Sequence, residues 1–217
     1  MRNLIIALAF GSLGACSSGP VIPDWKMNAH GAIESSVAAH LLGNATLADA
    51  EFARAKNEVA GTGRPDLLAR VILIHCAAQV ASLELDACAD FGALAVDATA
   101  ADRAYAQFLA GRWDGLDPAL LPEQYRAVFS SKEPVAALAG MADPLSRLIA
   151  SAALFQRQQL PPAGVAAAVA SASDQGWRRP LLAWLGVQAQ LATAKGDTVE
   201  AGRVQRRIDL VGGVGLK

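Results

Sequence analysis

Signals that begin and end helices recur along the chain at short intervals. Prolines suited to a first helical turn and glycines suited to a helix end are Pro65, Pro134, Pro144, Pro162, Pro180, Gly43, Gly61, Gly111, Gly176 and Gly196. Ala and Leu are abundant, Tyr and Phe are few, and β-branched runs are short, so helix is favoured over strand. The pattern predicts an all-α fold of about ten short helices.

Short breaks between short helices favour antiparallel hairpins. The sequence predicts a short helix around Tyr125 and Phe129. The other predicted helices span residues 25–42, 46–60, 65–82, 87–97, 99–111, 134–141, 144–158, 162–176, 180–196 and 198–210. Asp24, Thr46 (with Asp49 as its partner) and Asp86 are expected N-caps. The pairs Thr99 with Asp102 and Asp143 with Pro144 are further start signals.

The N-terminus has the pattern of an export signal. A charged start containing Arg2 precedes an apolar run, Leu4–Leu13, that is shorter than the about 20 residues a spanning helix needs. The motif Leu13-Gly14-Ala15-Cys16 resembles the lipobox of bacterial lipoproteins. The resemblance implies that Cys16 is acylated and becomes the new N-terminus, and Ser17 after it implies the periplasmic face of the outer membrane. The alternative is an ordinary secretory signal followed by a chance cysteine.

These features divide the chain into a signal peptide (1–15), an acylated tether (16–23), one helical domain (24–211) and a frayed tail (212–217). Loss of Arg2 with the signal leaves 18 basic and 20 acidic side chains, a formal charge of −2. Such a balance creates no strong positive field, so nucleic acid is not an expected partner. The membrane, through the lipid anchor, and other envelope proteins are expected partners, and no cofactor is expected.

Cys76 and Cys88 remain after Cys16. The periplasm is oxidising, so this pair is a candidate disulfide, and two buried free thiols are the alternative. His75 beside Cys76 does not predict a metal site, because adjacent helical residues point in different directions and no metal-ligand spacing is present.

Small residues after two helix-ending glycines resemble the tetratricopeptide (TPR) pattern. The two sets are Gly43, Ala48, Phe52 and Ala55, and Gly196, Ala201, Gln205 and Ile208. Ser36, where a small apolar residue is usual, and Gln205, where an aromatic is usual, depart from that pattern, and residues 66–142 match it poorly. A TPR-like α-solenoid and an irregular helical bundle both remain open.

No nucleophile elbow, zinc-protease motif or phosphate-binding loop follows the signal segment. Glu34-Ser35 resembles the catalytic Glu-Ser of lytic transglycosylases, which would make Glu34 an acid acting on peptidoglycan. Residues 43–63 lack the glycine-rich motif of those enzymes, which favours Glu34 as a solvated helix carboxylate. We therefore expect no catalytic residue.

Candidate partner-binding residues lie near the end of the chain and at two helix breaks. Arg203, Arg206 and Arg207 form an i, i+3, i+4 basic stripe, and Trp113 and Trp177 stand between helices, where aromatics can anchor partners. For the arginines the alternative is a solvated helix face without a partner. For the tryptophans the alternative is that they cover the edges of the core. The sequence predicts a non-enzymatic, membrane-anchored periplasmic adaptor, with a cell-wall enzyme or a small-ligand or lipid carrier as alternatives.

Overall fold

The computed structural model describes residues 22–86 and 88–213 and confirms the all-α fold, with no strand in either range. Its elements are α1 (Asp24–Leu42), α2 (Ala45–Ala60), α3 (Pro65–Ala81), η1 (Ala89–Leu94), α4 (Ala100–Leu109), η2 (Pro118–Leu120), α5 (Glu123–Ser130), α6 (Pro134–Ala139), α7 (Pro144–Gln156), α8 (Pro162–Asp174), α9 (Arg178–Ala194) and α10 (Thr198–Gly212). Here η denotes a 3₁₀ helix.

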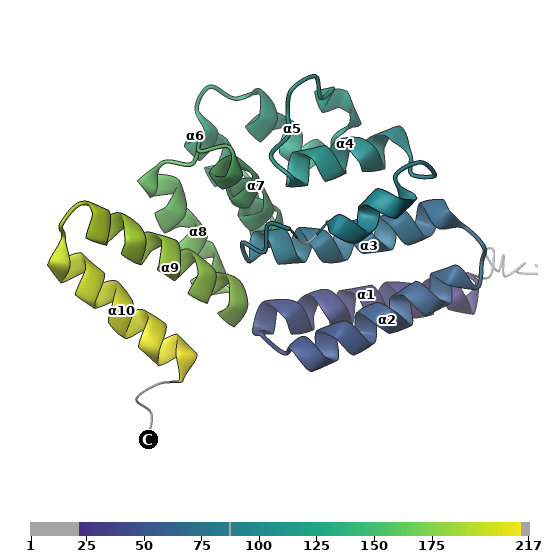
Figure 1. Cartoon of the computed structure of the whole chain (residues 1–217), viewed down its shortest axis with the longest axis horizontal. Helices are drawn as coiled ribbons and strands as arrows, with labels where there is room; N and C mark the ends of the chain where they lie inside the picture. Colours follow the sequence, from purple (N-terminus) through teal and green to yellow (C-terminus); the bar gives the residue numbers. More distant parts are fainter. Residues whose placement is uncertain (1–21, 87, 214–217) are drawn as a thin grey trace, which may run out of the picture.

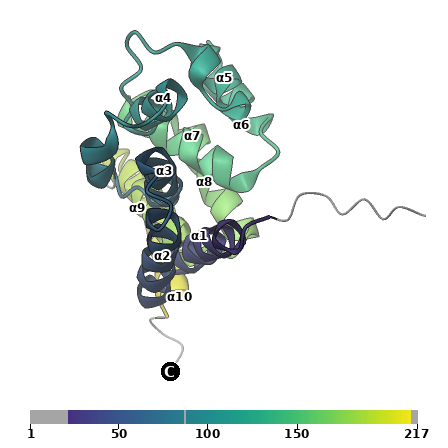
Figure 2. The same cartoon turned by 90° about the vertical axis from the view of Figure 1, so that its right-hand side faces the viewer.

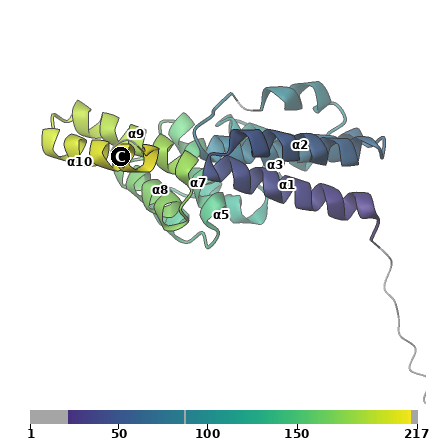
Figure 3. The ribbon, with the colours of Figure 1, turned by 90° about the horizontal axis from the view of Figure 1, so that it is seen from below.

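The helices form an elongated arrangement with a hairpin at each end. Figure 1 shows the antiparallel pair α1–α2 at one end and the pair α9–α10 at the other. Helix α3 packs against α1, α2 and α4 as well as against α7, which is distant from it in sequence. The view at right angles places α4, α5 and α6 on the side of α3 away from α2 (Figure 2). Seen from below, α7 and α8 lie between the two terminal hairpins (Figure 3).

A tight turn joins α1 to α2. Gly43 has φ of 85°, a left-handed conformation that glycine adopts readily, and Asn44 N donates back to Ala39 O at 2.8 Å. The Asn44 side chain then caps α2 by accepting from Leu47 N at 3.2 Å. The predicted cap at Thr46 was wrong, because Asn44 takes that role first and Thr46 lies inside the helix.

Other boundaries also differ from the prediction. The segment expected as a helix over 87–97 forms only the 3₁₀ helix η1, and α9 begins at Arg178, so that Pro180 lies within its first turn. The expected start of a tail at residue 212 was wrong, because α10 continues to Gly212 and is capped by Gly213, with φ of 77°. Asp24 is the first residue of α1 rather than its cap. Residues 214–217 lie outside the described ranges.

The main core runs from α3 to α10, and α3 and α7 are its most buried helices. Leu73, Leu148 and Leu154 are at most 1% exposed, and Trp184 of α9 is fully buried with Nε1 donating to Ala81 O at 3.0 Å. A smaller apolar cluster joins α1, α2 and α3 and includes the buried alanines Ala29, Ala32 and Ala55. Small side chains let the helices of this end approach closely.

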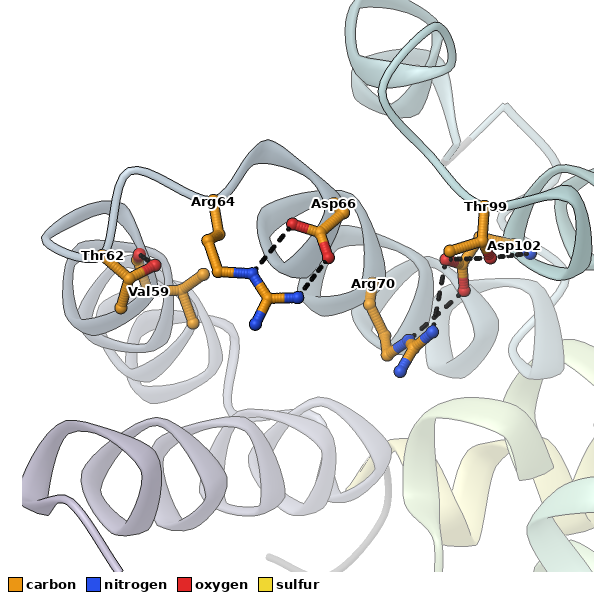
Figure 4. Close-up of polar contacts among 7 residues, drawn as sticks. All are labelled: Val59, Thr62, Arg64, Asp66, Arg70, Thr99 and Asp102. Atoms are coloured by element: carbon orange, nitrogen blue, oxygen red, sulfur yellow. Dashed lines mark hydrogen bonds and ion pairs between the residues drawn. The ribbon is translucent and has the colours of Figure 1, made fainter.

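Polar contacts fix α3 against α4 (Figure 4). Thr99 caps α4 by accepting from Asp102 N at 3.1 Å, and its hydroxyl donates to the Asp102 carboxylate at 2.6 Å, so this predicted start signal is confirmed. Arg70 of α3 reaches the same carboxylate, with Nε 3.3 Å from Oδ1. Arg64 and Asp66 make a separate exposed pair at the start of α3.

A disulfide joins Cys76, within α3, to Cys88, immediately before η1, with the Cα atoms 5.3 Å apart. It links the buried side of α3 to the segment that leads to α4. The link lies in the main core, where Cys76 is only 1% exposed.

Candidate functional site

An open groove of about 490 Å³ lies over α3, between α1 and α7. The residues that line it come from six separate places in the chain and are mostly aliphatic or aromatic. They are Ile33, Glu34, Val37, Ala38, Leu41, Ile74, Ala77, Tyr105, Tyr125, Asp143, Leu145, Ser146, Ile149 and Trp177. The volume falls in the roughly 300–1,000 Å³ range of ligand-binding pockets.

The periodicity of α1 places one of its stripes along the groove. Ile33, Val37 and Leu41 are spaced by four residues, so they lie on one face of the helix. Helix α3 contributes Ile74, which is 40% exposed although its neighbours Leu73 and His75 are buried. Ile33 and Leu41 are buried at the base of the groove, so Ile74 is the large aliphatic side chain of α3 that the groove leaves exposed.

Two tyrosines and two carboxylates supply the polar character of the groove. The hydroxyls of Tyr105 and Tyr125 lie 3.5 Å apart, and burial raises the pKa of both phenols further above physiological pH. Asp143 caps α7 by accepting from Ser146 N at 2.7 Å, which confirms the predicted start signal there. Glu34 is exposed on α1 and lies 3.3 Å from His30. Glu34 and Asp143 are the charged side chains among the described residues that line the groove.

A set of polar contacts holds the start of α9, and with it Trp177, against α1. Arg179 donates from Nε to His40 O at 3.1 Å and from Nη1 to Glu84 Oε1 at 2.8 Å. Leu83 follows the end of α3 with φ of 61°, a left-handed conformation, and the turn is closed by Glu84 N, which donates to Gln79 O at 3.0 Å. The turn at Leu83 leads directly to Glu84, which accepts from Arg179.

Two buried histidines and a serine connect α1, α2 and α3. Ser36 is fully buried; its Oγ donates to Ala48 O at 2.9 Å and lies 3.1 Å from His75 Nδ1. The His75 ring stacks on Phe52 with centroids 3.9 Å apart. Burial lowers the pKa of His75 and lowers that of His40 to about 4, because desolvation outweighs the attraction of Glu84. Solvent does not reach Ser36, so this cluster is a structural contact between helices.

The two tryptophans predicted to bind a partner, Trp113 and Trp177, lie in different surroundings. Trp113 is 8% exposed, its Nε1 donates to Phe108 O at 3.1 Å and its ring stacks on Phe108. Arg157 also lies over its ring, 4.8 Å from the centroid, and Trp113 lines a separate cleft of about 500 Å³, so its role as an anchor for a partner stays a prediction. Trp177 is half-buried as the N-cap residue of α9 and lines the groove.

The predicted basic stripe lies on α10, on residues that do not line the groove. Arg203 and Arg206 are exposed, and Arg203 pairs with Glu200 at 2.7 Å, which offsets part of the positive charge. Arg207 is half-buried. The predicted lipidation residue Cys16 lies outside the described residues.

Sequence reasoning missed the aliphatic lining. Residues 71–78 read Val-Ile-Leu-Ile-His-Cys-Ala-Ala, which is apolar on nearly every face and is typical of a fully buried helix. Nothing in that run distinguishes the exposed Ile74 from its buried neighbours. Glu34, considered as a catalytic acid, instead lies exposed at the groove.

Within residues 22–86 and 88–213, no three His, Cys, Asp or Glu side chains gather to hold a metal ion. Over those same ranges, none of the helices has the length and apolar character needed to cross a membrane. Comparisons of the chain with protein-family models, with curated proteins and with solved structures found no match.

Proposed function

We propose that this protein is a membrane-anchored periplasmic lipoprotein that acts as a helical adaptor in a cell-envelope complex, with the groove over α3 as its binding surface. The observation that carries the proposal is the groove itself, an open and mainly apolar surface that leaves Ile74 40% exposed. Open apolar grooves between helices are a common way to hold a segment of another protein. In this proposal the protein catalyses no reaction and instead holds a partner at the membrane.

The proposed localisation rests on the sequence Leu13-Gly14-Ala15-Cys16 and on Ser17. The disulfide between Cys76 and Cys88 supports an oxidising compartment, because such bonds form and persist there. Replacement of Cys16 by Ser is expected to prevent acylation and to release the protein from membranes after a salt wash. A variant that stays with the membrane would refute the anchor.

A TPR-like origin of the terminal hairpins is part of the proposal. It is supported by the turn glycines Gly43 and Gly196 and by the small residues Ala48 and Ala201 at matching distances after them.

Photo-crosslinking in intact cells tests the binding surface directly. A benzoyl-phenylalanine at Ile74 is expected to capture a reproducible set of envelope proteins, because this side chain lies in the groove. The same group at Val96, which is 85% exposed and not part of the groove, is the matched control. Equal capture from both positions, or capture from neither, would count against the adaptor.

The alternative of a cell-wall enzyme depends on Glu34, whose side chain is 69% exposed and pairs with His30. A carboxylic acid that protonates a sugar usually lies in a pocket with little water. Cleavage of peptidoglycan by the wild type that is lost in Glu34→Gln would establish this alternative in place of the adaptor.

A further inference from the structure

We infer that the groove over α3 selects a protein segment that combines aliphatic side chains with lysine or arginine, an inference that rests on the proposed adaptor function. The groove has two kinds of surface. Its walls are aliphatic and aromatic, and its charged side chains, within the described part of the chain, are both carboxylates: Glu34 on α1 and Asp143 at the start of α7.

The carboxylates determine the charge of the occupant. Neither an arginine nor a lysine lines the groove among the residues described, and the His30 that pairs with Glu34, 3.3 Å away on α1, does not line it either. A fatty acid or an anionic lipid headgroup would meet these carboxylates as a like charge, which is unfavourable. A cationic side chain would meet them as the opposite charge.

The tyrosines add no charge to the groove. The hydroxyls of Tyr105 and Tyr125 lie 3.5 Å apart, and these phenols are neutral at physiological pH. The negative charge is thereby confined to the two carboxylates, whereas the surface between them is apolar. Lysine and arginine suit such a surface, because their aliphatic stems lie along apolar side chains while the charged end reaches a carboxylate.

Two labelled peptides of about 15 residues, long enough to form a marginal helix, test the inference. Both carry leucines on one helical face; one carries lysines beside that face, and the other carries glutamates at the same positions. Binding to the purified, acylated protein in detergent is measured by fluorescence anisotropy. The lysine peptide is expected to bind about tenfold more tightly than the glutamate peptide, the scale of two exposed ion pairs, and to weaken as salt is added.

Matched variants connect binding to the groove. Glu34→Gln with Asp143→Asn removes both charges and keeps the cap of α7, because asparagine caps helices as well as aspartate does. This double variant is expected to bind the lysine peptide about tenfold more weakly and with less dependence on salt. Ile74→Gln is expected to weaken both peptides, whereas Val96→Gln, at a position 85% exposed, leaves binding unchanged.

The outcomes separate this inference from the proposed function. Equal binding of both peptides that Ile74→Gln weakens would overturn the charge preference and leave the adaptor intact. Failure of both peptides to bind, or binding that Ile74→Gln does not change, would overturn both. Binding of dodecanoate in preference to the lysine peptide would identify a lipid carrier instead. A dimer seen by sedimentation that Ile74→Gln dissociates would identify a second copy of the chain as the occupant.

Discussion

The two terminal hairpins begin from similar local signals and end with different degrees of burial. In the N-terminal hairpin, Gly43 with Asn44 makes the turn, and in the C-terminal hairpin Gly196 with Asp197 makes it; both glycines have a positive φ. Five positions after each glycine stands an alanine. Ala48 is 1% exposed, whereas Ala201 is half-buried.

The difference comes from what each hairpin packs against. Both α1 and α2 contact α3, and the fully buried Ser36 connects α2 to α3 through Ala48 O and His75. In the C-terminal hairpin α9 lies in the core, but α10 packs mainly on α9 and buries only Val204 among its described residues. A turn and small residues therefore produce a hairpin, but its neighbours determine how much of it is core.

The largest expected effect is a difference in stability cost between a substitution in α9 and one in α10. Trp184→Ala is expected to lower the free energy of unfolding by about 3–5 kcal/mol, because it removes a fully buried indole and its hydrogen bond to Ala81 O. Val199→Ala, on α10 and 82% exposed, is expected to stay within about 0.5 kcal/mol. Urea denaturation followed by circular dichroism measures both, and a similar cost for the two variants would contradict the difference in burial.

Enlarging the paired alanines compares the hairpins at equivalent positions. Ala48→Leu is expected to cost about 1–3 kcal/mol, since the larger side chain has no space between α1 and α2. Ala201→Leu is expected to cost less than about 0.5 kcal/mol, because its site is partly open. Thermal unfolding of the two variants provides the test, and equal shifts in Tm would show that the two turns lead to equally packed hairpins.

Acid is expected to destabilise the N-terminal end selectively. The pKa of His40 is lowered to about 4 and that of His75 is lowered too, so between pH 6.5 and 4 the unfolded chain binds more protons than the folded one. The stability present above pH 6.5 is therefore lost as the pH falls towards 4. The groups that face these rings are Glu84, Arg179, Asp49, Lys56 and Ser36.

Hydrogen exchange at pH 7 and pH 5 measures this loss. After correction for the intrinsic pH dependence of exchange, we expect protection to fall more in α1 and α2 than in α9 and α10 between pH 7 and pH 5, because His40 and His75 lie at that end of the molecule. His40→Gln is expected to flatten the pH dependence of unfolding even if it lowers stability at pH 7. An unchanged pH dependence in His40→Gln would exclude His40 as its cause.

The smallest expected effect concerns the basic stripe. Arg203→Ala is expected to leave the midpoint of urea unfolding nearly unchanged, because Arg203 is exposed and pairs with Glu200 on the same helix. The change is expected to shrink further at high salt. A larger loss in urea denaturation would mean that α10 contributes more to stability than its burial indicates.

Much of the local structure followed from the sequence. Pro65 and the caps at Thr99 and Asp143 stand where the structure begins α3, α4 and α7. These predictions succeed because a helix start depends on backbone donors and on side chains within three or four residues. The choice of Asn44 over Thr46 shows the limit, since two neighbouring residues of capping type compete and the end of α1 at Gly43 decides between them.

The tertiary structure alone decided which surfaces remain uncovered. Trp113 and Trp177 both stand at helix breaks, yet Trp113 is buried against Phe108 and Trp177 lines the groove. Ile74 is exposed within a run that is apolar on nearly every face. The helices follow from contacts between near neighbours in the sequence. The groove and the Arg179 contacts depend on how α1, α3, α7 and α9 pack together. This packing brings together residues as distant in the sequence as His40 and Arg179, and no local sequence pattern indicates it.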